Sequence, residues 1–193
     1  MFSTAKKYWI RVKLALVHKE NIGKNIQLIA PRLISCPKGS LFVGKDFFAG
    51  PSLYISMNSY CKLEIYDAVM FGPDVMVLGG NHKFAFVADH LRYCSLDDEA
   101  SKDIKVESGV WLGARSLLLS GANIGEGSII GACSLVNKRV PPYTISAGVP
   151  VKALRPRFSS TADLVEVLRV TESTYTLPMV LEQYERAGIS MPN

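Results

Sequence analysis

A six-residue repeat between Val106 and Pro141 constrains the fold of this chain more than any other feature. Read in sixes, the stretch is VESGVW, LGARSL, LLSGAN, IGEGSI, IGACSL and VNKRVP. An aliphatic residue opens every hexad: Val106, Leu112, Leu118, Ile124, Ile130 and Val136. A second small or apolar residue follows four positions later: Val110, Ser116, Ala122, Ser128, Ser134 and Val140. A fixed internal period indicates a repeat architecture, in which each unit buries its apolar face against its neighbours.

The period of six identifies the kind of repeat. It matches neither the 3.6 residues of a helical turn nor the simple alternation of a strand. It is typical of a parallel β-helix, in which short strands and turns alternate and successive coils stack. The opening aliphatic residue then points inward, and the small residue near each corner fills a place too tight for a large side chain. Glycines such as Gly121 and Gly127 suit the corner turns. We therefore predict an all-β fold, a parallel β-helix.

The repeat extends toward the N-terminus. The opening position continues at residues six apart: Leu53, Ser59, Ile65, Phe71 and Val77. The second inward position continues at Met57, Leu63, Val69 and Val75. Before them, the segments IGKNIQL and FVGKDFF carry the same aliphatic-glycine pattern, with a slip in spacing between them. We predict that the β-helix covers residues 22–157.

Residues 78–103 break the register, and the repeat resumes near Ile104. A long excursion from a compact repeat is typical of a functional loop. We therefore predict a protruding loop here. Two of the three histidines of the chain, His82 and His90, lie in it.

The two ends of the chain lack the hexad. In residues 1–21, helical spacing relates Phe2, Ala5, Trp9, Val12 and Leu16. Alternate residues such as Ile10 and Leu14 also fit a strand. We predict a helix that either packs on the first coil or a neighbouring subunit, or rests on an anionic membrane. For residues 158–193 we predict helices that begin near Thr161 and after Pro178. These helices would form a cap, a subunit contact or a partner-binding tail. We expect a single domain over residues 1–193.

Composition limits the classes of function. The hydrophobic content of 48% and charged content of 20% are ordinary for a globular protein. A formal net charge of +5 is compatible with an anionic ligand, but no nucleic-acid-binding motif is present. No apolar stretch is long enough to span a bilayer, and no secretory signal is evident. We therefore expect a cytoplasmic protein, with peripheral contact to the inner face of the membrane through residues 1–21 left open.

The four cysteines are Cys36, Cys61, Cys94 and Cys133. None forms a CxxC pair or a zinc-type spacing, so we expect reduced structural thiols. Cys61 and Cys133 fall inside hexads, where a small buried side chain fits. His18, outside the coil motifs, is expected on the surface.

The C-terminal half of the repeat carries a family resemblance. The segment GVWLGARSLLLSGANIGEGSIIGACSLVNKRVPPYTISAGVPVKALR resembles the hexapeptide-repeat acyltransferases. The most similar group is that of the galactoside, maltose and polysaccharide O-acetyltransferases, over residues 40–157. The resemblance implies a left-handed β-helix and a homotrimer with active sites between subunits. It also implies acetyl-CoA as co-substrate, no metal, and a loop that projects over the active site of a neighbouring subunit.

His82 is the predicted catalytic residue. It follows FGPDVMVLGGN, where the coil ends and the loop begins, and the family has its catalytic histidine at this place. Transfer of an acetyl group from a thioester to a hydroxyl needs a base, and imidazole titrates near neutral pH. If both substrates bind together, proximity makes an acyl-enzyme unnecessary. His90 is interpreted as a supporting loop residue.

Residues around the base are candidates for acceptor binding. Asn81 directly precedes His82, and a backbone N–H nearby could stabilise the oxyanion. Ser52, Ser56 and Asn58 lie on the coil that precedes the loop. The similar sugar acetyltransferases have a substrate-contacting asparagine slightly earlier, where this chain reads FFAGPS. The identity of the acceptor therefore stays open.

The donor site is marked by charge. Between Gly127 and Ala162 the chain has no acidic residue and these basic ones: Lys138, Arg139, Lys152, Arg155 and Arg157. Basic side chains can hold the anionic phosphates of coenzyme A, although the pattern alone also fits an ordinary basic surface.

The resemblance assigns the donor-binding residues individually. It implies that Ala114 and Ala132 leave room for the pantetheine arm and that Lys152 and Arg155 face the phosphates. Asn137 and Lys138 would lie near the adenine, where the family often has Thr-Lys. Trp111 would line the groove, or simply pack.

The sequence thus predicts an acetyl-CoA-dependent O-acetyltransferase for a hydroxyl of a sugar or surface-polysaccharide precursor. Alternatives with the same fold are an N-acetyltransferase for an amino sugar and an O-acetyltransferase for an antibiotic. A β-helix carbonic anhydrase would need three histidine ligands, and His18 lies far from the coil motifs that surround the other two. A non-catalytic β-helix scaffold would need neither the loop histidine nor the basic terminus.

Overall fold

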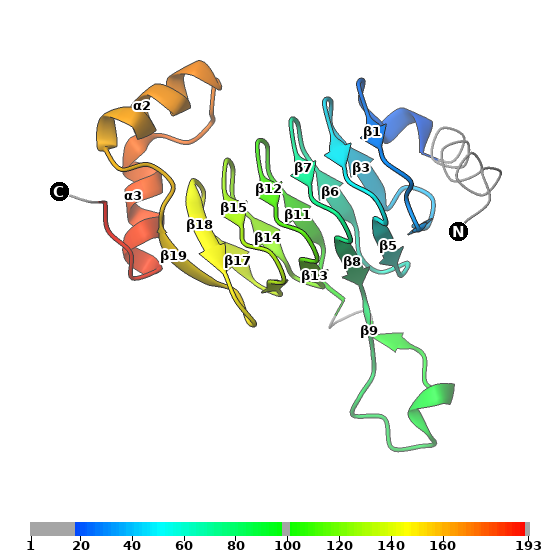
Figure 1. The fold of residues 1–193 in the computed structure, drawn as a ribbon. Helices are drawn as coiled ribbons and strands as arrows, with labels where there is room; N and C mark the ends of the chain where they lie inside the picture. The colour runs from blue at the N-terminus through cyan, green and yellow to red at the C-terminus, as the bar shows by residue number, and fades with distance from the viewer. Residues whose placement is uncertain (1–17, 98–100, 192–193) are drawn as a thin grey trace.

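A computed structural model describes residues 18–97 and 101–191 of the chain. Short strands stack along one axis, a loop protrudes from one edge, and two helices lie at the C-terminal end (Figure 1). Most of the predicted N-terminal helix, with its proposed membrane contact, lies outside the described residues. The described chain starts with a 3-10 turn, η1 (Lys19–Asn21).

Three sheets form the faces of the coil. Sheet A contains β3 (Leu41–Val43), β6 (Leu63–Ile65), β11 (Ile104–Val106), β14 (Asn123–Ile124) and β17 (Arg139–Val140). Sheet B contains β1 (Gln27–Leu28), β4 (Phe48–Ala49), β7 (Met70–Phe71), β12 (Trp111–Leu112), β15 (Ile129–Ile130), β18 (Thr144–Ala147) and β19 (Lys152–Pro156). Sheet C contains β2 (Leu33–Ser35), β5 (Tyr54–Met57), β8 (Met76–Gly79), β13 (Leu117–Leu119) and β16 (Leu135–Val136). Neighbouring strands in each sheet are parallel, apart from the final antiparallel pair β18–β19.

The hexad register is the register of the coils. Val106 pairs with Ile124, and Leu118 pairs with Val136, so equivalent hexad positions stack directly. All of the inward positions predicted between Val106 and Val140 are buried, with at most 2% of each side chain exposed. The predicted all-β, parallel β-helix is therefore confirmed.

The six-residue register predicted for the residues before Ile65 is wrong, because extra residues between β5 and β6 shift it. Ten residues, rather than six, separate the equivalent strand positions Ile55 and Ile65, because a longer corner joins β5 to β6. Leu53 therefore stacks in the frame of the second inward position, and Ser59 is exposed in the corner. The prediction that Leu53 and Ser59 continue the opening position failed because the repeat tolerates extra residues between strands.

Every long connection between coils occurs at the same edge, where sheet C gives way to sheet A. The connections are residues 36–40, 58–62 and 80–103, and the last of them is the predicted loop. Because each strand pairs only with its equivalents above and below, insertions at this edge leave the stack intact. The loop contains β9 (Asn81–His82), η2 (Leu91–Tyr93) and β10 (Leu96–Asp97), with β9 and β10 antiparallel.

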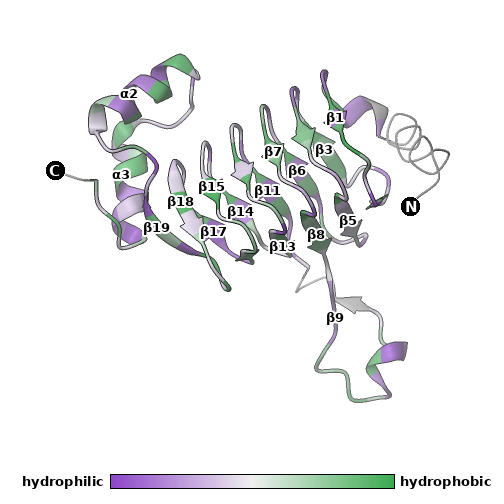
Figure 2. Ribbon diagram, viewed as in Figure 1, coloured by the Kyte–Doolittle hydropathy of each residue, from purple (hydrophilic) through white to green (hydrophobic). Residues whose placement is uncertain are grey.

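The C-terminal helices are present as predicted. Helix α2 (Thr161–Val170) begins at Ser160, whose side chain accepts a hydrogen bond from the Asp163 backbone, and α3 (Leu177–Arg186) follows. The two helices bury a separate cluster against the end of the coil: Tyr143, Leu164, Leu168, Val180 and Tyr184. Figure 2 shows hydrophobic colour along the strands of the coil and polar stretches on both helices. His18, expected on the surface, is only 5% exposed.

Candidate functional site

Most of the predicted site residues flank sheet C. Ser52, Ala114 and Ala132 lie at the corner where sheet B turns into sheet C. The backbone ladder of this corner includes a hydrogen bond of 2.9 Å from the Cys133 N–H to the Ala114 carbonyl. Cys133, expected to point inward, is instead exposed, because it takes the left-handed turn position with φ of 59°.

The opposite edge of sheet C carries further candidates. Ser56 lies on β5, and Asn58 follows that strand. Asn137 and Lys138 are both exposed in the short turn between β16 and β17. Trp111 is separated from all of these, because β12 places it on the outer face of sheet B, where it is 47% exposed.

Asn58 and Ser101 close the base of the loop. The Asn58 amide donates to Ser101 Oγ at 3.0 Å, and the Asn81 backbone N–H donates to the same hydroxyl at 3.2 Å. Asn58 Oδ1 accepts hydrogen bonds from the Tyr60 backbone and from the Cys61 thiol. Burial raises the pKa of this thiol, although a hydrogen bond from the Asn58 backbone to the sulfur opposes that shift.

Gly80 is required at this place. Its φ is +101°, and an added Cβ would lie 2.0 Å from the Asn58 amide nitrogen. The close approach in the structure is to Asn58, and Ser101 is a contributor that the sequence analysis missed. No motif in the sequence marks Ser101, which lies 43 residues from Asn58.

His82 lies on the protruding loop. It pairs with Leu96 in the β9–β10 hairpin, its side chain is exposed, and its Nδ1 lies 3.8 Å from the Cys94 sulfur. The hairpin extends away from the coil (Figure 1). The same loop exposes large apolar side chains: Phe84 at 79%, Val87 at 97% and Tyr93 at 72%. Exposed apolar residues gathered on one element are typical of a contact surface.

A groove of about 810 Å³ brings two predicted donor-binding residues together. Lys138 and Lys152 lie on the coil side of this groove, and Met179, Gln183 and Arg186 of α3 form the other side. Arg155 is not among its lining residues, and its guanidinium donates to the Pro156 carbonyl at 3.2 Å. Helix α3 as a wall of the groove was not expected from the sequence.

Arg139 joins the coil to the C-terminal segment. Its guanidinium donates to Glu107 at 3.1 Å, to Asn123 at 2.6 Å, to Tyr175 at 2.8 Å and to Gln183 at 3.1 Å. Burial alone would lower the pKa of Arg139, but hydrogen bonding to Tyr175 and the charge of Glu107 raise it. Arg139 is therefore held by the fold through its hydrogen bonds, although both it and Lys138 are exposed.

Two negative observations concern the described residues. Across residues 18–97 and 101–191, histidine, cysteine and acidic side chains form no group of three or more that could hold a metal ion. In the same part of the chain, no helix has the length and apolar character needed to cross a membrane.

Comparison with known proteins identifies relatives of the coil. A family model described as "Bacterial transferase hexapeptide (six repeats)" matches residues 103–138. The galactoside O-acetyltransferase of Lactococcus lactis is 33% identical over 118 residues, which are 59% of this chain and 55% of that protein. A chloramphenicol acetyltransferase of Escherichia coli is 46% identical over 57 residues, 30% of this chain and 27% of that protein. The chain spans about half the length of the first curated relatives it matches.

A solved structure extends the likeness to three dimensions. The maltose O-acetyltransferase from Clostridium difficile 630 superposes with a TM-score of 0.58 at 29% identity. The match covers 69% of this chain and 67% of that chain. The left-handed form of the β-helix, which the resemblance implied, is thereby confirmed.

Proposed function

The chain belongs to the bacterial transferase hexapeptide family, and from that premise we propose that it is an acetyl-CoA-dependent O-acetyltransferase. The proposed acceptor is a hydroxyl of a sugar or surface-polysaccharide precursor. The names of the galactoside and maltose O-acetyltransferase relatives support this acceptor class. The proposed assembly is a homotrimer with active sites between subunits.

The observation that carries the proposal is the position of His82. It is an exposed imidazole at the start of the longest loop, soon after strand β8 of sheet C. As general base, it accepts the proton of the acceptor hydroxyl while the oxygen attacks the thioester carbonyl. The new C–O bond forms as the C–S bond breaks, and the coenzyme thiol takes up a proton. Both substrates bind together, so proximity supplies part of the rate and no acyl-enzyme forms.

The donor binds along sheet C. The corner alanines Ala114 and Ala132 leave room for the pantetheine arm, and the exposed ammonium groups of Lys138 and Lys152 face the groove beside α3. Ammonium groups bind phosphate oxygens through charge-assisted hydrogen bonds. The phosphates and adenosine of coenzyme A therefore lie at the C-terminal end of the coil.

The acceptor is held between the loop and a neighbouring subunit. The outward direction of the hairpin and the exposed Phe84, Val87 and Tyr93 favour contact with a second chain. Ser56, Asn81 and Asn58 are the candidate polar contacts, with Ser52 further away at the other corner. The hydrogen bonds of Asn58 favour a role in bracing the loop.

The match to a chloramphenicol acetyltransferase favours a second candidate, an antibiotic hydroxyl as acceptor. This match covers 30% of the chain, so it supports similarity of the coil more than similarity of the whole protein. A panel of sugars, amino sugars and chloramphenicol with mass spectrometry of the products would separate the O-acetyl, N-acetyl and antibiotic alternatives.

The decisive experiment is release of free thiol from acetyl-CoA by His82→Ala in the presence of an acceptor. Loss of a general base lowers kcat by about 10²- to 10⁴-fold, and His90→Ala in the same loop serves as the matched control. A His82→Ala protein that keeps the parent rate would overturn the mechanism. Lys138→Ala and Lys152→Ala should each raise the KM for acetyl-CoA by about tenfold, since a hydrogen bond to a charged group contributes about 1.5–3 kcal/mol. Lys24→Ala, an exposed lysine at the other end of the coil, should leave that KM unchanged.

A further inference from the structure

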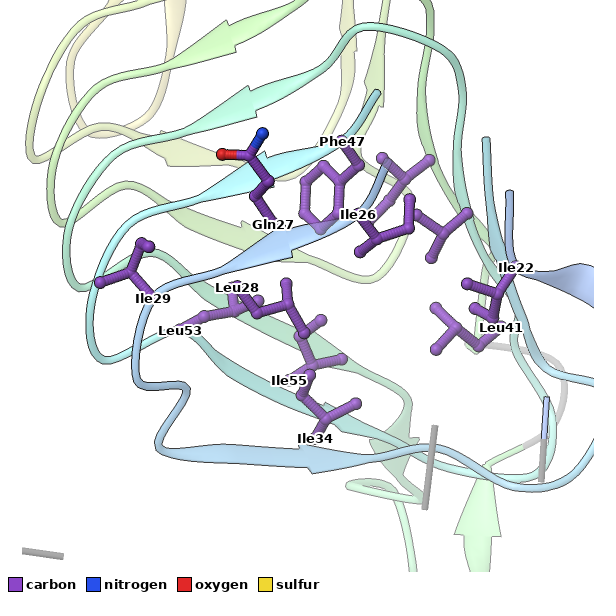
Figure 3. A pocket seen from close by; sticks show the side chains of 12 residues that line it. Ile22, Ile26, Gln27, Leu28, Ile29, Ile34, Leu41, Phe47, Leu53 and Ile55 are labelled. Atoms are coloured by element: carbon purple, nitrogen blue, oxygen red, sulfur yellow. The ribbon is translucent and has the colours of Figure 1, made fainter. Parts of the chain in front are cut away.

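Two hollows among the described residues differ in the charge of their lining. The cavity at the N-terminal end of the coil has a volume of about 440 Å³, and its described lining consists of apolar side chains and Gln27 (Figure 3). The larger groove, between the coil and α3, has a charged lining. Its charged residues are Lys138, Arg139, Lys152, Glu182 and Arg186. Because basic groups outnumber the single carboxylate, the groove is suited to an anionic ligand.

One face of α3 forms a wall of this groove. Met179, Gln183 and Arg186 are spaced at i, i+4 and i+7, so they share one face of the helix, and all three line the groove. Val180 and Tyr184 lie on another face and are at most 1% exposed in the cluster at the end of the coil. The buried face therefore fixes the helix in place, while the other face is presented to the groove.

Hydrogen bonds also join this wall to the coil. The Gln183 side-chain oxygen accepts from Arg139 at 3.1 Å, and Arg139 donates to Glu107 at 3.1 Å. The charge of Arg139 is thus matched by a carboxylate. Lys138 and Lys152 are exposed, and among the described residues neither forms an ion pair. These two lysines are therefore the cations of the coil that remain for a ligand.

Arg186 adds a third cation from the side of the helix. Its guanidinium lies 2.5 Å from the Glu182 carboxylate, one turn earlier, and the two side chains are 74% and 58% exposed. An exposed ion pair of this kind contributes little to stability, so the guanidinium can turn to another anion at small cost. A planar guanidinium can donate two parallel hydrogen bonds to one phosphate group, which an ammonium cannot do.

The order of the groups along the coil indicates which phosphate reaches α3. The thioester of acetyl-CoA must lie near His82, which follows β8, whereas α3 lies beside β19 at the C-terminal end of the coil (Figure 1). In coenzyme A the 3′-phosphate, on the ribose, is further from the thiol than the pyrophosphate is. The 3′-phosphate is therefore the group that extends past the last strands of the coil.

We propose that Arg186 binds the 3′-phosphate of coenzyme A from α3, opposite Lys138 and Lys152 of the coil. The groove then distinguishes the coenzyme from its 3′-dephospho form. This proposal rests on the proposed use of acetyl-CoA as donor. Helix α3 lies outside residues 40–157, over which the sequence resembles the family, so the contact comes from the C-terminal extension of this chain.

Calorimetric titration with coenzyme A and with 3′-dephospho-coenzyme A tests the contact. Arg186→Ala should weaken binding of coenzyme A by about tenfold, the fold-change expected for a hydrogen bond to a charged group, and leave binding of the dephospho form unchanged. Arg186→Lys, which keeps the charge but not the fork, should recover part of the loss. Glu182→Gln should strengthen binding of coenzyme A, because it removes a carboxylate that repels the phosphate.

Arg169→Ala is the matched control. Arg169 lies on α2, its side chain is 69% exposed, and it pairs with Glu166 at 2.6 Å, but it does not line the groove. Its loss should leave the binding of both forms unchanged. Arg169 and Arg186 are thus alike in exposure and in having a partner on their own helix, so a difference between the two variants reports on the groove.

Three results would overturn the proposal. The first is an Arg186→Ala protein that binds coenzyme A as tightly as the parent, which leaves the proposed activity standing. The second is an equal loss of affinity for both forms of the coenzyme, because the contact is then not with the 3′-phosphate. The third is a parent protein that binds neither form, which would contradict the use of coenzyme A as well.

Discussion

The two ends of the coil differ in how far the described residues cover their apolar side chains. At the C-terminal end, Val140, Tyr143 and Val151 are at most 2% exposed, because β19 and the two helices fold over the last coil. At the N-terminal end, the described residues of the first coil line an apolar cavity, and Ile29 among them is 46% exposed. A stack of identical units has no intrinsic end, so the C-terminal closure depends on a segment that does not follow the repeat.

The interior also changes along the axis. The N-terminal coils are filled by apolar side chains such as Phe47 and Leu53, whereas later coils bury hydroxyls. Ser128 Oγ donates to the Pro141 carbonyl at 2.6 Å, and Ser134 Oγ donates to the Gly131 carbonyl at 2.7 Å. Buried hydroxyls are tolerated here because they satisfy backbone carbonyls. The polar part of the interior lies toward the C-terminal end, which β19 and the two helices cover.

The largest expected effect is at the closed end. Tyr184 is 1% exposed, and its hydroxyl donates to the Tyr143 carbonyl at 2.7 Å. Tyr184→Ala should lower the free energy of unfolding by about 3–5 kcal/mol, as for other large-to-small changes of buried aromatics. Tyr184→Phe removes only the hydrogen bond and should cost about 1 kcal/mol. Denaturant unfolding measures both, and similar losses for the two variants would contradict the packing role of the ring.

A pair of glycines compares the ends with a smaller effect. Gly127 has φ of +65°, and an added Cβ would lie 2.4 Å from the Tyr143 ring. Gly39, toward the N-terminal end, has φ of +80° and open space around it. Gly39→Ala should cost about 1–2 kcal/mol from the left-handed backbone alone. Gly127→Ala should cost about 2–4 kcal/mol, because overpacking adds to the same backbone term. Equal losses of unfolding free energy would show that the Tyr143 ring moves aside for the methyl group added at Gly127.

The smallest expected effect concerns alkaline pH. Burial, together with a hydrogen bond to Glu126, raises the pKa of Tyr143 to about 12. Because the phenol keeps its proton longer in the folded than in the unfolded state, its contribution to stability is complete below about pH 10. That contribution is lost as pH rises toward 12. Thermal unfolding of the parent and of Tyr143→Phe between pH 9 and 12 should show a shallower decline for the variant. Parallel declines would contradict this assignment.

Much of the architecture could be predicted because the hexad is a local pattern with one geometric solution. Val106 and the positions at six-residue intervals from it had to point inward, so that residues three hexads apart, such as Val106 and Ile124, stack. The place where the pattern stopped had to be a loop. His82 was found because it follows directly after the last strand before that loop. Helix α2 was found from its start signal at Thr161. Helix α3 was also found, although it begins at Leu177 and not after Pro178.

Other features could not be predicted from the sequence, because they depend on contacts between residues that are far apart in the chain. The slip between Leu53 and Ile65 depends on a corner of variable length, which the period cannot reveal. Ser101 meets Asn58 only when the loop closes on the coil. Arg139 was interpreted as one basic residue of a donor site, but its guanidinium is hydrogen-bonded to Glu107, Tyr175 and Gln183.

The sequence by itself determined the coil, its inward positions, the loop and the two terminal extensions, since each of these follows from local spacing. Only the tertiary structure decided which distant parts of the chain lie beside one another. It placed Lys138 and Lys152 beside α3, separated Trp111 from sheet C, and directed the hairpin of His82 away from the coil. These outcomes depend on how segments far apart in the chain pack together, and the free energy of that packing is not a property of any single segment.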